Sequence, residues 1–164
     1  MQQLKKRLHL ILLLILTFNC ASQKEAKIFV MDNEKVLTYE QAESLNNLVL
    51  NHEEKTTNEI AIITTPDWEN HESALLFAVA LSNKLGVGKE GKDNGVLIVF
   101  SKAMRETRIN TGYGTEKVLT DEIAKKIIDS LMIPKFREEL YYEGIYAGTK
   151  AVIDFLELPE NIIK

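Results

Sequence analysis

An uninterrupted apolar run at residues 96–100, Val-Leu-Ile-Val-Phe, constrains the fold of this chain more than any other feature. A strand that is apolar at every position must be buried on both faces, as in sheets that carry helices on both sides. A polar, glycine-rich segment at 87–95 precedes the run, and a polar turn at 101–106 follows it. These residues are therefore expected to form the central strand of a sheet.

The neighbours of this strand are also readable from the sequence. Residues 59–65 form a second apolar run that ends at Pro66, and residues 107–111 alternate in the manner of a hairpin arm. A helix-length segment separates the two apolar runs, and a strand–helix–strand connection favours a right-handed parallel crossover. Residues 27–31 could add a weak edge strand. We expect a small mixed sheet of about four strands.

The segments before, between and after these strands carry apolar residues at helical spacing. The first helix begins at a capping box formed by Thr38 and Gln41. The order helix, strand, helix, strand, strand, helix, helix predicts an α/β fold, a three-layer α/β/α sandwich with helices flanking both faces of the sheet. The helices are expected at 39–55, 73–85, 121–133 and 141–156.

Two of these helices carry more detailed expectations. Thr120 is expected to cap the third helix, which Pro134 is expected to end. Gly86 is a suitable left-handed residue to end the second helix. The side chains of the second helix expected to face inward are Leu75, Leu76, Val79 and Ala80.

The N-terminus has the architecture of a secretory signal. A basic segment at 5–7 precedes a mostly apolar segment at 8–16, which is short for a membrane span. Cys20 follows, and its placement resembles a lipoprotein signal in which this cysteine is acylated; the alternative is an ordinary signal with an unmodified cysteine. We expect an exported protein of the cell envelope or periplasm, anchored in the membrane by a lipid on Cys20. The expected organisation is a signal at 1–19, a tether at 20–33, a domain at 34–158 and a tail at 159–164.

Composition excludes several functional classes. The formal net charge is −4 and no basic stripe is present, so nucleic acid is not an expected partner. Cys20 is the only cysteine, which excludes disulfides and cysteine-ligated zinc from the mature domain once it is acylated. The histidines His9, His52 and His71 are not paired at zinc-binding spacing, and His52 is expected to be a hydrogen-bonded helix residue. The chain also has no phosphate-binding Walker loop and no Gly-x-Ser-x-Gly elbow.

Carboxylates form the remaining candidate site. In an antiparallel hairpin the start of one arm lies beside the end of the other, so Asp93 should sit next to the segment that carries Glu116, with Asp121 close by. Clustered carboxylates repel one another, and a hard cation such as Ca²⁺, which takes oxygen ligands in flexible numbers, relieves the repulsion. Asn94 and backbone carbonyls could complete the set, and Mg²⁺ is the second candidate ion. The alternative is that these acids are solvated loop and cap residues.

Several segments resemble the motifs of the TPM domain family. They are Gly-Lys-Glu-Gly-Lys-Asp-Asn-Gly-Val-Leu-Ile-Val at 88–99, Arg-Ile-Asn-Thr-Gly-Tyr-Gly-Thr-Glu at 108–116, Val-Leu-Thr-Asp at 118–121, and the closing segments 134–137 and 141–144. The resemblance covers about residues 36–156. The family groups thylakoid-lumen acid phosphatases, photosystem II repair proteins, a modulator of levamisole receptors and many exported bacterial proteins.

The resemblance implies an α/β/α sandwich and two functions. In the first, the domain binds a divalent cation through Asp93, Glu116 and Asp121, which match the acidic cluster of the family, and acts through envelope proteins. In the second, it is a metal-dependent acid phosphatase for phosphomonoesters, with Arg108 or Arg137 clamping the phosphate. The chain lacks the known nucleophile motifs of phosphatases, which favours binding over catalysis.

Overall fold

The computed structural model describes residues 27–163 and contains a four-stranded mixed sheet in the order β1-β2-β3-β4. The strands β1 (Val30–Asp32), β2 (Glu59–Thr64) and β3 (Gly95–Ser101) are parallel. Strand β4 (Glu106–Thr111) pairs antiparallel with β3 and forms the predicted hairpin. The predicted signal and the lipidation of Cys20 lie outside the described residues.

The apolar runs form the two central strands, as predicted. Every residue of β2 and of β3 is buried, and Ile62 pairs with Ile98 in the middle of the ladder. In the edge strand β4 only Ile109 is buried, and the other residues are partly or fully exposed. Strand β1 lies inside the segment predicted as a tether, so the folded domain begins before residue 34.

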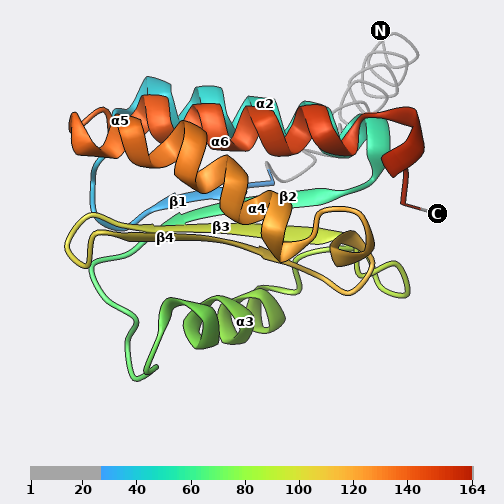
Figure 1. The fold of residues 1–164 in the computed structure, drawn as a ribbon, viewed down its shortest axis with the longest axis horizontal. Helices are drawn as coiled ribbons and strands as arrows, with labels where there is room; N and C mark the ends of the chain where they lie inside the picture. Colours follow the sequence, from blue (N-terminus) through green and yellow to red (C-terminus); the bar gives the residue numbers. More distant parts are fainter. Residues whose placement is uncertain (1–26, 164) are drawn as a thin grey trace, which may run out of the picture.

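Helices cover both faces of this sheet and confirm the three-layer sandwich (Figure 1). On one face, α2 (Tyr39–Thr56) lies beside α6 (Tyr141–Leu156), with α4 (Asp121–Ile127) and α5 (Ile133–Arg137) in the same layer. On the other face lies α3 (Ala74–Leu85) alone. The capping box of Thr38 and Gln41 is present, and Gly86 ends α3 in the left-handed conformation.

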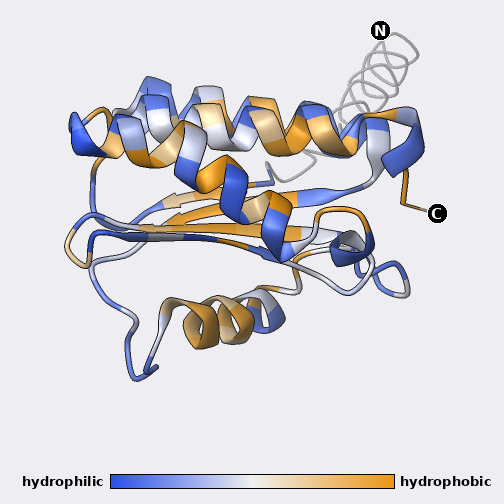
Figure 2. Cartoon of the chain, viewed as in Figure 1, coloured by the Kyte–Doolittle hydropathy of each residue, from blue (hydrophilic) through white to orange (hydrophobic). Residues whose placement is uncertain are grey.

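The predicted inward face of α3 was wrong. Ala74, Phe77 and Ala78 are the residues of this helix that pack in the core. Because α3 is apolar on most of its surface, as Figure 2 shows, the spacing of its apolar residues does not define a single face. The small alanines allow the helix to approach the sheet closely. The outward residues are Leu75, Leu76, Val79 and Ala80.

The prediction that Pro134 ends the third helix was also wrong. A π-helical turn, η2 (Ile128–Met132), follows α4, and α5 continues the chain directly. Pro134 lies in the first turn of α5, where its missing N–H is no loss and its fixed φ suits a helix. A new helix therefore follows the widened turn directly, and the residue expected to stop the old helix is its second residue.

Close packing holds α6 against this layer. A side chain on Gly148 would collide with Met132, and one on Gly144 would collide with the ring of Phe136. The centroid of the same ring lies 4.5 Å from the ring centroid of Phe100 on β3.

Within residues 27–163, none of the helices combines the length and apolar character that crossing a membrane requires.

The predicted tail is folded rather than separate from the domain. The 3₁₀ turn η3 (Pro159–Asn161) follows α6, and Asn161 donates a hydrogen bond to the carbonyl of Phe155. Ile163 packs against the core. The C-terminal residues therefore belong to the folded domain, and Ile162 and Ile163 line a hollow near the ends of α2 and α6.

Candidate functional site

The two glycine-rich loops that carry the predicted acids lie side by side. The N–H of Gly112 donates to the carbonyl of Gly95 over 2.9 Å, and the N–H of Gly114 donates to the carbonyl of Asp93 over 3.0 Å. These bonds extend the β3–β4 pairing beyond the two strands. The predicted proximity of Asp93 to the segment 112–116 is thus confirmed.

The contact between the two loops depends on glycine residues, which have no side chain. A side chain on Gly112 would collide with the carbonyl of Asp93, and one on Gly114 would collide with the carbonyl of Lys92. Both collisions are with backbone, which cannot rotate away as a long side chain can. The glycines therefore allow the loops to touch through their main chains.

Asn94 holds the first loop from inside the protein. Its side chain is fully buried, and its Oδ1 accepts the N–H of Lys89 over 2.8 Å. Its Nδ2 donates to the carbonyl of Thr57 and to Oδ1 of Asn58, both over 3.0 Å. Asn94 was predicted to offer an oxygen to a metal ion, and the structure shows it positioning the loop.

An ion-pair cluster that the sequence interpretation missed fixes the start of the same loop. Lys89 Nζ lies 2.6 Å from Oε1 of Glu59 and 2.6 Å from Oε1 of Glu53, and Lys27 contacts the same two carboxylates. Glu59 also accepts the N–H of Gly88. The one available signal was a glutamate at the first position of an otherwise apolar buried strand.

Electrostatics around Glu59 favour its charged form. Burial alone would raise its pKa, but hydrogen bonds from Lys27, Lys89 and the N–H of Gly88 lower the pKa to about 2. Hydrogen bonds to Glu53 and Glu59 in turn raise the pKa of Lys89. The cluster is therefore ionised at neutral pH and attaches the loop to β2.

The other predicted acids do not converge with Asp93. Glu116 is an exposed residue of η1 (Thr115–Lys117), and the Asp121 side chain is 87% exposed at the start of α4. Among residues 27–163, no group of three or more His, Cys, Asp or Glu side chains is placed to hold a metal ion. The structure brings the loops together but does not preform a ligand set.

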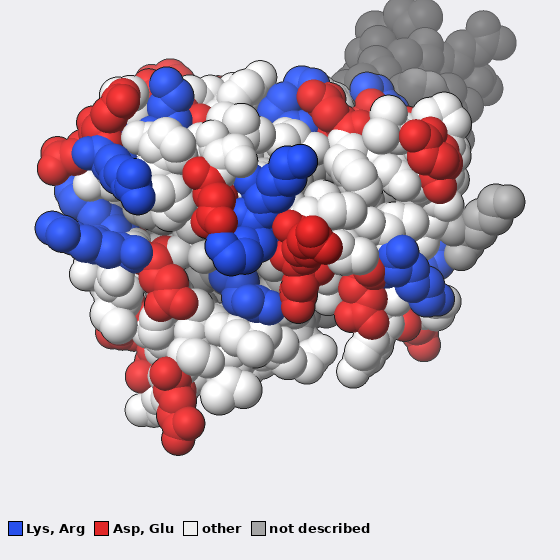
Figure 3. Space-filling view, in the orientation of Figure 1, with Lys and Arg blue, Asp and Glu red and all other residues white. Residues whose placement is uncertain are grey.

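The two predicted phosphate-binding arginines lie on separate elements. Arg108 is on β4, and its Nη2 lies 3.6 Å from Oδ1 of Asp121. Its Nε is buried and has no hydrogen-bond partner within the described part of the chain. Arg137 is exposed in the last turn of α5. Positive and negative side chains intermingle on the face shown in Figure 3, in line with the small net charge.

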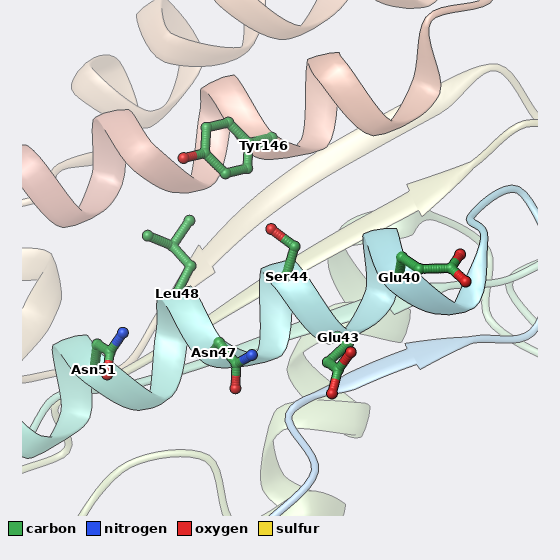
Figure 4. Close-up of a pocket in the computed structure, with 7 residues that line it drawn as sticks. All are labelled: Glu40, Glu43, Ser44, Asn47, Leu48, Asn51 and Tyr146. Carbon is green, nitrogen blue, oxygen red and sulfur yellow. The ribbon is translucent and has the colours of Figure 1, made fainter.

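A hollow of about 430 Å³ lies between the outer sides of α2 and α6. In Figure 4, Tyr146 of α6 projects toward Ser44 and Leu48 of α2. Among the described residues, two glutamates are the only charged groups that line it, so this part of the chain offers the hollow no cation to bind phosphate. The residues around it are Glu40, Glu43, Ser44, Asn47, Leu48, Asn51 and Tyr146.

Comparisons with known proteins agree with the fold. The family model for the TPM domain matches residues 30–155. The N-terminal domain of a protein from P. gingivalis is 32% identical, with a TM-score of 0.73, and the alignment covers 82% of this chain and 85% of that one. No match was found among curated proteins.

Two further solved structures resemble this one at lower identity and support the fold alone. The BA42 protein of Bizionia argentinensis is 19% identical, with a TM-score of 0.65, and the alignment covers 80% of this chain and 97% of that one. The N-terminal domain of the cg2496 protein of Corynebacterium glutamicum is 10% identical, with a TM-score of 0.63 and coverage of 82% and 83%. With the family match spanning most of its length, the chain belongs to the TPM domain family.

Proposed function

We propose that this protein is an extracytoplasmic TPM domain that binds a divalent cation, Ca²⁺ in preference to Mg²⁺, and acts through protein partners at the cell envelope. The observation that carries the proposal is the contact between the two glycine-rich loops, which holds Asp93 beside the segment of Glu116. The carboxylates of the two loops would have to gather around the ion when it binds, since the described residues preform no ligand set.

The choice of Ca²⁺ follows from the irregular geometry of these loops. Ca²⁺ accepts carboxylate and backbone oxygens in variable number, whereas Mg²⁺ demands near-octahedral ligands and gives up its water reluctantly. Because Asp93, Glu116 and Asp121 are not gathered in advance, ion binding must order them. We therefore expect a dissociation constant of about 10⁻⁴–10⁻³ M, typical of extracellular calcium modules.

The membrane anchor is a separate part of the proposal. We propose that Cys20 is acylated after export, and that residues 20–26 connect the lipid to the folded domain. A doubly acylated cysteine would anchor stably, since two chains hold a protein where one chain binds reversibly. Labelling with radioactive palmitate tests this, and the label should disappear in a Cys20→Ala variant.

A Ca²⁺ titration followed by amide NMR tests the ion site. Amide shifts should concentrate in residues 91–95 and 111–122, and Asp93→Asn should abolish or greatly weaken them. The matched control is Asp154→Asn, which removes an exposed aspartate from α6, far along the chain from both loops. Shifts that are absent, or that fall outside the two loops, would rule out this site.

Phosphatase activity is the second candidate function. The specific observation in its favour is the buried Nε of Arg108, which has no partner within residues 27–163 and could donate to a phosphoryl oxygen. Turnover of a phosphomonoester panel that Arg108→Lys and Asp93→Asn both abolish would establish catalysis over binding. Turnover that both variants retain would come from a contaminant.

A further inference from the structure

A chain of polar contacts joins the end of α2 to the end of α6, apart from the glycine-rich loops. His52 is 1% exposed, and its Nδ1 lies 3.0 Å from Oε1 of Glu157. Its Nε2 lies 3.3 Å from Oγ1 of Thr56, one helical turn further along α2. The fold therefore brings together a hydroxyl, an imidazole and a carboxylate, although His52 and Glu157 are 105 residues apart in the sequence.

The protonation states suit a general base. Burial lowers the pKa of His52, and the hydrogen bond and charge of Glu157 oppose this only in part, while nearby Lys55 lowers it further. The hydrogen bond from His52 lowers the pKa of Glu157. At neutral pH an ionised Glu157 accepts the proton of Nδ1, which leaves the lone pair of Nε2 directed at Thr56.

The hydroxyl of Thr56 has two acceptors for its proton. It donates to the carbonyl of His52 over 2.8 Å, and Nε2 lies within reach as the alternative. The N–H of Asn58 donates to the same oxygen over 3.1 Å. One lone pair of Oγ1 therefore remains free for attack on a carbon centre.

A hollow of about 300 Å³ is lined in part by Thr56. Its lining includes three apolar and four polar or charged residues: Leu156, Ile162 and Ile163, and Lys55, Thr56, Asn58 and Glu157. The Oδ1 of Asn58 accepts from Asn94, so its amide nitrogen is the group left to donate to a ligand. The hollow can hold a short acyl chain with its carbonyl group near Thr56.

We propose that Thr56, His52 and Glu157 form a nucleophile–base–carboxylate triad that hydrolyses small carboxylic esters in this hollow. The arrangement meets the geometric requirement for an activated nucleophile, in which the nucleophile contacts a base that a third group orients. The proposed cation site does not enter into this reaction, so either can fail alone.

The reaction balances with water as the only co-reactant. Oγ1 of Thr56 attacks the carbonyl carbon and forms a C–O bond, while its proton passes to Nε2 of His52. The amide of Asn58 and the ammonium of Lys55 stabilise the oxyanion. The ester C–O bond then breaks, and His52 returns the proton to the departing alcohol.

Deacylation repeats these steps with water. His52 takes a proton from water, the hydroxide oxygen bonds to the acyl carbon, and the Thr56–acyl bond breaks as the proton passes back to Oγ1. The products are one carboxylic acid and one alcohol.

Hydrolysis of p-nitrophenyl butyrate by the purified full-length chain tests the proposal. Thr56→Val, which keeps the volume and removes the hydroxyl, should lower the rate about a hundredfold or more, and Thr56→Ser should retain activity. Thr57→Val is the matched control, since the adjacent hydroxyl contacts Lys92 and not His52. The rate should rise with pH with a midpoint below 6.5, the ordinary pKa of histidine.

Covalent labelling gives a second, independent readout. A fluorophosphonate ester should form one adduct that peptide mass spectrometry places on Thr56, and His52→Gln should prevent it. Equal rates for the wild type and Thr56→Val, no adduct on Thr56, or equal losses in Thr56→Val and Thr57→Val would each overturn the triad. Failure of the Ca²⁺ titration would leave these results unchanged.

Discussion

Replacing Glu59 with glutamine tests how strongly the ion-pair cluster stabilises the fold. The side chain is only 9% exposed, and its partners lower its pKa from 4.5 to about 2. A difference of about 2.5 pKa units corresponds to about 3.4 kcal/mol, since each unit is worth 1.36 kcal/mol. Because Lys27 and Lys89 are 44% and 40% exposed, solvent screens part of this, and we expect Glu59→Gln to cost about 2–3 kcal/mol at pH 7.

The pH dependence gives the sign of the effect. The pKa of Glu59 is lower in the folded chain than in the unfolded chain, so its contribution is complete above about pH 4.5 and is lost as the pH falls toward 2. The wild type should lose this component of stability in that window. Glu59→Gln has already lost the charge and should show a flatter curve there.

Urea denaturation at a series of pH values measures both quantities. Glu54→Gln is the control, because it removes the charge of an exposed glutamate on α2 and should change the free energy of unfolding by less than about 0.5 kcal/mol. If Glu59→Gln were as mild as this control, or lost as much stability as the wild type on acidification, the reasoning about the cluster would be wrong.

Three other changes have expected outcomes that thermal or urea unfolding can measure. Gly114→Ala should lower the free energy of unfolding by at least about 2 kcal/mol, because the added methyl group would collide with backbone. Gly91→Ala adds its methyl group to open space and should lower it by about 1 kcal/mol, because of the left-handed φ at this position. Equal losses would contradict the loop contact. Thr38→Ala should cost about 1 kcal/mol through loss of the capping box, and no change would mean that the cap is not formed in solution. Phe77→Ala should cost about 3–5 kcal/mol, whereas Leu76→Ala should cost much less because Leu76 is 49% exposed; the reverse order would restore the inward face first predicted for α3.

Much of the fold could be predicted because its signals are local. The apolar run at 96–100 requires burial on both faces, and the box at Thr38 satisfies backbone donors within one helical turn. The hairpin placed Asp93 beside Gly114 because the pairing of two strands fixes the backbone beyond them. Each of these features depends on neighbouring residues or on one strand pair.

The rest depends on contacts between distant segments or on side-chain directions. Backbone pairing brought the loops together, yet it could not show that Glu116 and Asp121 point into solvent. The cluster around Glu59 draws its partners from several segments, and His52 meets Glu157 only after α2 and α6 have packed. Pro134 was misleading because its usual role as a helix terminator does not apply within the first turn of a new helix.

The position of α3 has a consequence for how this molecule opens. On one face of the sheet the helical cover is a single short helix, α3, which packs on β3 and β4. Partial unfolding should thus start there, uncovering apolar strand surface while the other helical layer remains closed. Such a transient state would be the form of the molecule most exposed to proteases and to self-association.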